Sequence, residues 1–164
     1  MAEKRTYVIF DGDNDRWAFS YMRGWKNNYR LDFEFDDAHS LFTLTDRARD
    51  EDYIKSKLLK RFASTGEVIL LIGESTRYLY KFVRWELDVA LWLGLPIIAV
   101  NLNNKRSIDY KLCPPIIREA GAVHVSFNMA IIRYALQDFS FLPPNERNAA
   151  DYYYTDHVYR SLGL

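Results

Sequence analysis

The feature that most constrains the fold is a pair of short apolar runs, VILLI at residues 68–72 and IIAV at residues 97–100. Strands whose side chains are apolar on both faces are typical of the centre of a parallel sheet, where helices cover both faces. Neighbouring parallel strands need a long crossover, and residues 81–94 have the period of a helix that ends at Gly94, before Pro96. These segments predict a buried β-α-β unit.

Strand-like and helix-like segments alternate over most of the chain. Further strands are expected at residues 6–10, 31–35 and 122–127, and further helices at residues 15–28, 50–64, 114–120 and 128–138. This alternation indicates an α/β fold, with a five-stranded parallel sheet and helices on both of its faces. One domain is expected over residues 1–142, followed by a Tyr-rich tail, residues 143–164, that packs on the domain or on a partner.

The charge balance and the cysteine content narrow the class of protein. The 22 basic and 22 acidic side chains cancel, which argues against a general binder of nucleic acid or of anionic membranes. The single cysteine, Cys113, excludes a disulfide within the chain and fits a reducing cytosol. The chain has no signal-peptide pattern and no apolar run long enough to span a membrane, so a soluble cytoplasmic protein is expected.

On the predicted helix at residues 81–94, one acidic residue, Glu86, falls in the middle of the apolar face. That face is formed by Phe82, Trp85, Val89 and Leu93. Arg84 and Asp88, an i, i+4 pair of opposite charge, mark the side expected to face water. A carboxylate that faces a core is costly unless it has a partner or lines a cavity. Glu86 is therefore either a structural group, bonded to an arginine or a backbone N–H, or the working group of a pocket.

Ligands of doubly wound sheets bind outside the carboxyl ends of the strands. This rule places three segments around one crevice: the loop at residues 11–15, the loop at residues 36–50 and the start of the helix that carries Glu86. The acids Asp11 and Asp13 also invite comparison with phosphorelay receiver domains. Receivers need an aspartate after the third strand and a lysine after the fifth, and this chain has neither, so that function is disfavoured.

Other common motifs are absent from the sequence. It contains no Walker loop, no GxGxxG and no GxSxG, which argues against kinases, dinucleotide-binding domains and hydrolases that depend on these motifs. Its three histidines, His39, His124 and His157, are far apart and have no cysteine or carboxylate at ligand spacing. No metal site is therefore expected.

Four segments, in order along the chain, resemble the TIR domain superfamily, and in particular the bacterial TIR-like branch of the Thoeris anti-phage defence protein ThsB. They are FDGDNDRW at residues 10–17, VILLIGEST at residues 68–76, FVRWELDVA at residues 82–90 and LPIIAV at residues 95–100. That branch opens with a strand, an Asp/Asn loop and a tryptophan, and it carries Arg-Trp-Glu on the helix after the third strand. The resemblance covers about residues 5–127.

The resemblance implies a flavodoxin-like sheet with the strand order 2-1-3-4-5. It also implies that Glu86 matches the glutamate of TIR domains that cleave NAD. Many TIR domains place a tryptophan four residues before that glutamate. This chain has Phe82 at that position and its tryptophan directly before the glutamate, at Trp85.

NAD cleavage is chemistry that a single carboxylate can support. Nicotinamide is cationic in NAD and leaves without a general acid, so the site has to stabilise the positive charge that develops on the ribose. Glu86 is the expected catalytic residue, in a variant of glycoside chemistry with one carboxylate. Position alone suggests substrate-binding roles for Phe10, Asp11, Asp13, Arg47 and Trp85. Aromatic rings would stack on nicotinamide or adenine, and charged groups would orient the ribose and the phosphates.

Two hypotheses of function follow. The first is an NAD glycohydrolase or ADP-ribosyl cyclase, which takes NAD as its substrate, needs no cofactor and makes an ADP-ribose signal, expected to be cyclic. That diffusible nucleotide would activate a separate effector in anti-phage defence, after a phage-derived trigger and self-association through TIR-like surfaces. The second is a non-catalytic TIR-like interaction module that works through its helix surfaces and the loop at residues 36–50.

Overall fold

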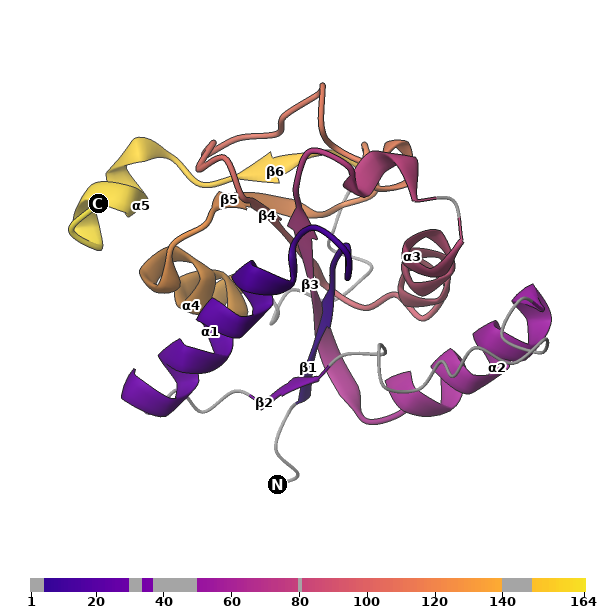
Figure 1. Cartoon of the computed structure of the whole chain (residues 1–164). Coiled ribbons are helices and arrows are strands. Elements are labelled where there is room, and N and C mark those ends of the chain that lie inside the picture. Colours follow the sequence, from indigo (N-terminus) through magenta and orange to yellow (C-terminus); the bar gives the residue numbers. More distant parts are fainter. Residues whose placement is uncertain (1–4, 30–33, 37–49, 80, 140–148) are drawn as a thin grey trace.

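The computed structural model describes residues 5–29, 34–36, 50–79, 81–139 and 149–164. They form an α/β fold around a sheet of six parallel strands in the order β2-β1-β3-β4-β5-β6 (Figure 1). The strands are β1 (Arg5–Ile9), β2 (Glu34–Asp36), β3 (Thr65–Ile72), β4 (Ile97–Asn101), β5 (Val123–Ser126) and β6 (Tyr152–Tyr153). The two apolar runs lie in β3 and β4 at the middle of the sheet and are buried along their whole length.

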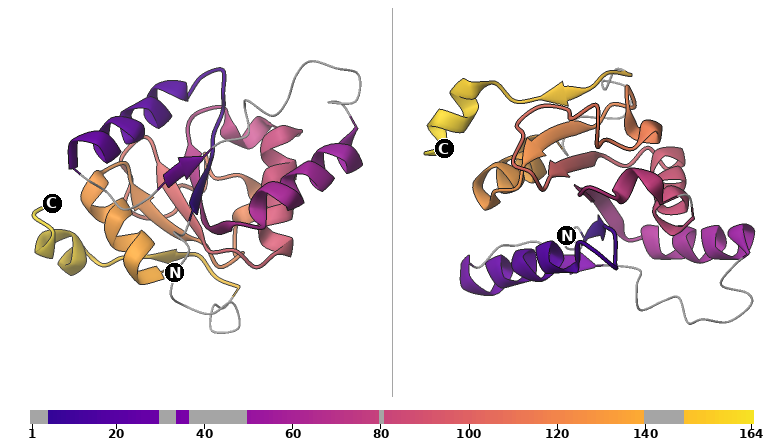
Figure 2. Two further views of the ribbon diagram at one scale, coloured as in Figure 1. Left: turned by 90° about the horizontal axis from the view of Figure 1, so that it is seen from below. Right: turned by 45° about the horizontal axis from the view of Figure 1, so that its top comes forward.

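Helices cover both faces of the sheet (Figures 1 and 2). They are α1 (Arg16–Tyr29), α2 (Glu51–Phe62), α3 (Phe82–Trp92), α4 (Met129–Asp138) and α5 (Asp156–Ser161), with short 3-10 turns η2 (Thr76–Tyr78) and η3 (Pro115–Ile117). Helices α2 and α3 share one buried cluster with the sheet, and α1, α4 and α5 share the other. The expected α/β class with a parallel sheet is therefore confirmed.

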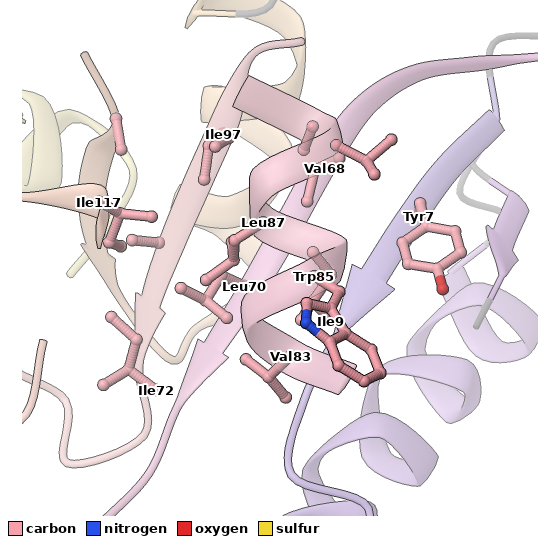
Figure 3. Packing of buried hydrophobic residues seen from close by; sticks show 14 of the residues in the cluster. Tyr7, Ile9, Val68, Leu70, Ile72, Val83, Trp85, Leu87, Ile97 and Ile117 are labelled. Carbon is pink, nitrogen blue, oxygen red and sulfur yellow. The ribbon is translucent and has the colours of Figure 1, made fainter. Parts of the chain in front are cut away.

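Side chains that alternate along the strands contribute to both buried clusters, as β1 and the residue after it show. Tyr7 and Ile9 belong to the cluster beneath α2 and α3, whereas Val8 and Phe10 belong to the cluster beneath α1 and α4. Successive side chains of a strand point to opposite faces, so each central strand serves two cores. Figure 3 shows the first cluster, with Leu87 of α3 above the strands and Tyr7 at one side.

Local side chains set the helix ends. The Asp50 carboxylate caps α2 by accepting hydrogen bonds from the backbone N–H groups of Asp52 (3.0 Å) and Tyr53 (3.4 Å). Asn128 caps α4 in the same way, through the N–H of Ala130 at 2.8 Å. The chain leaves α3 through Gly94, whose φ of 67° favours glycine.

Three predictions from the sequence, two about secondary structure and one about burial, are wrong. The tail contains β6 and α5, so the sheet gains a sixth strand and the helix predicted at residues 128–138 is not the last one. The helix predicted at residues 114–120 is the single 3-10 turn η3, because the backbone turns extended at Arg118. Phe82 of α3 and Leu93, which caps its end, were expected to face inward, but each residue is 38% exposed.

Candidate functional site

Glu86 lies on the face of α3 that packs against the sheet, and the residue is only 4% exposed. The hydroxyl of Tyr7, from β1, donates a hydrogen bond of 2.7 Å to Glu86 Oε2. Tyr7 is itself fully buried, with its ring edge-on to Phe62 at a centroid distance of 4.5 Å. The predicted burial of Glu86 is confirmed. Because buried polar groups bonded across two elements restrict each other, Glu86 is a positioned carboxylate in an apolar wall.

The opposite side of α3 is exposed and charged, as predicted. Arg84 Nε lies 3.4 Å from Asp88 Oδ1, and Lys55 of α2 reaches Asp88 Oδ2 at 3.3 Å. Trp85 is buried in the cluster that also contains Tyr7, the partner of Glu86, and its ring packs edge-on against that of Phe82, with centroids 5.5 Å apart. Trp85 therefore belongs to the same wall as Glu86.

The loop after β1 is organised by Asp11, which is almost fully buried. Its Oδ1 accepts hydrogen bonds from the backbone N–H groups of Asp13 (3.0 Å) and Asn14 (3.3 Å), and its Oδ2 accepts one from Asn14 Nδ2 at 2.8 Å. Asp13 is exposed in the same turn. Both carboxylate oxygens of Asp11 bond to groups of its own loop. Asp11 therefore fixes the loop rather than reaching into a crevice.

Phe10, which was predicted to bind substrate, does not join Glu86. Phe10 is 1% exposed and stacks on Phe19 at a centroid distance of 4.8 Å, on the face of the sheet opposite to that of Tyr7. A ring packed in this way contributes to the core rather than to a surface for a ligand. Arg47, with most of the loop at residues 36–50, lies outside the described residues.

A cavity of about 360 Å³ opens at the carboxyl ends of β1, β3 and β4. Its lining residues are Asn14, Asp15, Trp17, Ile72, Gly73, Glu74, Ser75, Leu102, Asn103 and Leu112. The cavity lies at the edge of the sheet that the fold rule indicated, but its described lining does not include the start of α3, which was expected there. Of the predicted site residues that the structure describes, none lines the cavity. The sequence pointed to the acids Asp11 and Asp13 of the loop, whereas the cavity is lined by Asp15 and the aromatic Trp17.

Asp15 is the most unusual of the cavity residues, because its carboxyl group is acidic, only 6% exposed and close to other acids. Burial raises its pKa, as do the negative charges of Asp11 and Glu74, and a hydrogen bond from Thr76 opposes them. The carboxylate also explains Gly73: a Cβ on that residue would lie 2.3 Å from Asp15 Oδ2. Because Gly73 follows β3 and Asp15 follows β1, no local sequence pattern connects them, and only the fold reveals the contact.

Two further kinds of feature concern the described residues: metal-binding clusters and membrane-spanning helices. There, no group of three or more His, Cys, Asp and Glu side chains is arranged to hold a metal ion. His124 is fully buried on β5, with Nε2 3.6 Å from Asp151 Oδ1, and burial lowers its pKa although Asp151 opposes that effect. In the same part of the chain, no helix has both the length and the apolar character that crossing a bilayer requires.

Comparison with known proteins assigns the chain to a family. The family model described as Thoeris protein ThsB, TIR-like domain, matches residues 7–107, which is more than half of the chain. The match runs from β1 to the end of β4 and includes Tyr7, Trp85 and Glu86. A search of the curated proteins finds no match. The chain therefore belongs to the ThsB family of TIR-like domains, which are modules of Thoeris defence.

Proposed function

We propose that this TIR-like module is an NAD-processing enzyme that releases nicotinamide and forms an ADP-ribose signal, expected to be cyclic. The observation that carries the proposal is the buried carboxylate of Glu86, held by the Tyr7 hydroxyl at 2.7 Å on a wall shared with Trp85. Buried carboxylates with a specific partner are uncommon outside functional sites and structural networks, so such a group is a candidate for chemistry. Membership of the family supports the same assignment.

The reaction would begin with heterolysis of the bond between the nicotinamide nitrogen and the ribose C1′. The electron pair of that bond leaves with nicotinamide, which becomes neutral, and positive charge develops on the ribose. Glu86 would stabilise that charge, directly or through the ribose hydroxyls, because a carboxylate in an apolar wall acts in a medium of low dielectric constant. Attack by water gives ADP-ribose; attack by a group of the same nucleotide, in a site that excludes water, gives a cyclic product.

Tyr7 has the role of a positioning residue in this scheme. Its hydroxyl donates a hydrogen bond to one oxygen of Glu86, and a hydroxyl brings no positive charge of its own. The ring is locked in the core against Phe62, so the hydroxyl occupies a fixed point. The strand beneath the helix thus sets the orientation of the Glu86 carboxylate.

The signal would act on a separate effector, and a phage-derived trigger and self-association would control the enzyme. These parts of the proposal rest on the defence family rather than on contacts in the chain. A trigger and self-association predict weak activity of the purified protein alone. Activity therefore has to be measured at high protein concentration and with lysate of infected cells.

The test is nicotinamide release from NAD, measured by chromatography for the wild type and for Glu86→Gln. The glutamine keeps the size of the side chain and an oxygen for the Tyr7 hydroxyl but removes the charge. A matched control is Glu51→Gln, an exposed glutamate in the first turn of α2. We expect Glu86→Gln to abolish release and Glu51→Gln to retain it; full activity of Glu86→Gln would disprove the proposed mechanism.

A non-catalytic interaction module is the second candidate, and one observation favours it. At the end of α3, Trp92 is 77% exposed and the neighbouring Leu93 is also exposed. Exposed apolar residues that adjoin one another are typical of surfaces that bind another protein. Self-association that depends on Trp92, together with no nicotinamide release in any state, would favour this function over catalysis.

A further inference from the structure

Helix α1 carries a ridge of aromatic side chains on its exposed face. Trp17 is 54% exposed, and Tyr21, about one turn further along, is 62% exposed. Trp25 continues the ridge by another turn and is half-buried, packed against the core cluster that α1 shares with α4. Exposed apolar residues that adjoin one another are typical of surfaces that bind another protein, and aromatic residues are enriched there.

The rings of this ridge hold one another in place. Phe127, which follows β5, packs edge-on against Trp17 at a centroid distance of 5.7 Å and contacts Trp25 at 5.1 Å. Tyr21 packs edge-on against Trp25, also at 5.7 Å. The ridge is therefore ordered before a partner arrives, and rigid aromatic side chains bind with little loss of conformational entropy.

A strip of small residues, Ser20 and Gly24, runs beside the ridge on the same face of α1. A Cβ on Gly24 would lie in open space, with no described atom within 4 Å of it. Packing within the described part of the chain therefore does not require a glycine, although glycine in a helix is less stable than alanine. What the glycine does allow is the close approach of another backbone.

Two arginines border the strip on the side away from the ridge. At 100° per residue, Arg16 and Arg23 fall beyond Ser20, and both are exposed. They are about two helical turns apart, roughly 10 Å along the axis. The ion pairs of the described residues involve other side chains, and α1 itself contains no aspartate or glutamate. The exposed face of α1 thus has an aromatic side, a small centre and a positively charged side.

We propose that this face of α1 binds an acidic amphipathic helix of another protein. The partner helix lies over Ser20 and Gly24, turns its apolar side chains toward the aromatic ridge and places carboxylates, two turns apart, against Arg16 and Arg23. Helix α1 covers the opposite face of the sheet from α3, which carries Glu86 (Figure 1). The inference therefore stands whether or not Glu86 cleaves NAD.

Two other occupants suit this face less well. A second copy of α1 supplies no carboxylate, so self-pairing of the helix leaves its arginines without a partner of opposite charge. A nucleic-acid strand supplies phosphates, but two arginines are a small positive patch, and the 22 basic and 22 acidic side chains of the chain cancel. Charge complementarity favours the acidic helix over both.

Fluorescence anisotropy with labelled, stapled helical peptides of about 15 residues, roughly the length of α1, tests the surface. The acidic probe has leucines along one face and glutamates two turns apart beside them, and its control has glutamine in place of each glutamate. We expect saturable micromolar binding of the acidic probe and about tenfold weaker binding of the control. Equal affinities, no binding at about 1 mM protein or tighter binding of an oligo(dT) strand would overturn the proposal. So would a dimer, seen by analytical ultracentrifugation, that Tyr21→Ala dissociates.

Variants locate the binding on α1. Gly24→Gln fills the strip with a better helix former, so it should weaken binding of the acidic probe about tenfold while the Tm rises, which separates lost binding from misfolding. Tyr21→Ala should weaken binding of both peptides, whereas Arg23→Gln should weaken binding of the acidic probe alone. Trp92→Ala on α3 and Lys60→Gln on α2, both at exposed positions, are the matched controls and should bind normally. Wild-type binding by Gly24→Gln, or equal losses in the controls, would overturn the proposal.

Discussion

The hydrogen bond between Tyr7 and Glu86 can be removed by deleting one oxygen atom, that of the Tyr7 hydroxyl. Tyr7→Phe deletes the hydroxyl that lies 2.7 Å from Glu86 Oε2 and keeps the ring against Phe62. Hydrogen bonds to charged groups contribute roughly 1.5–3 kcal/mol, and the carboxylate left behind is buried, so we expect the free energy of unfolding to fall by about 2 kcal/mol. For a domain of this size, that corresponds to a decrease in Tm of about 4–8 °C.

Chemical denaturation and thermal melting measure this loss directly. Tyr153→Phe is the control, because Tyr153 is exposed on β6 and its hydroxyl should contribute little. A double-mutant cycle then tests whether the effect passes through Glu86: in a Glu86→Leu background, Tyr7→Phe should cost about 1 kcal/mol less than in the wild type. Wild-type stability of Tyr7→Phe, or effects of the two changes that add within about 0.5 kcal/mol, would refute the reasoning.

Three further predictions concern other parts of the structure. Gly73→Ala should lower the free energy of unfolding by about 1–3 kcal/mol, because the new Cβ would lie 2.3 Å from Asp15 Oδ2; unchanged denaturation would contradict that contact. Asp15→Asn should stabilise the unliganded protein at neutral pH. The folded pKa of Asp15 is raised above 3.8, so its charge destabilises the fold above that raised pKa and the cost disappears as pH falls below 3.8. Denaturation at pH 7 and pH 3 checks the sign: the variant should be the more stable at pH 7 only. Tyr159→Ala should lower stability by about 3–5 kcal/mol, since the side chain is fully buried and its hydroxyl accepts a hydrogen bond from the Ser126 N–H at 3.2 Å; a melt like that of the wild type would show that the tail does not support the core.

The centre of the fold was predictable because its signals are local. The apolar runs in β3 and β4 have no polar residue to expose, and the intervening helix has a clear apolar face and a glycine stop at Gly94. The two-residue strand β6 has no such signal. It exists because the edge of β5 offers backbone partners, among them the Ala122 carbonyl, which accepts from the Tyr152 N–H at 3.0 Å.

The candidate site was predictable only in part. Helical periodicity alone places Glu86 inside, but its partner Tyr7 lies 79 positions earlier, so no local pattern connects the two. Phe10 was expected at a site, yet the alternation of β1 puts it on the opposite face from Tyr7. The cavity around Asp15 and Trp17 depends on three loops that meet only in the folded chain.

The central claim is that Glu86 carries NAD cleavage, and one measurement tests it most directly. NAD is incubated with wild type or Glu86→Gln at high protein concentration, with lysate of infected cells added. Nicotinamide and the product formed with it are then separated by chromatography and identified by mass spectrometry. The account predicts nicotinamide and an ADP-ribose product, cyclic by mass, from the wild type and neither from Glu86→Gln. Equal nicotinamide from both proteins would contradict it.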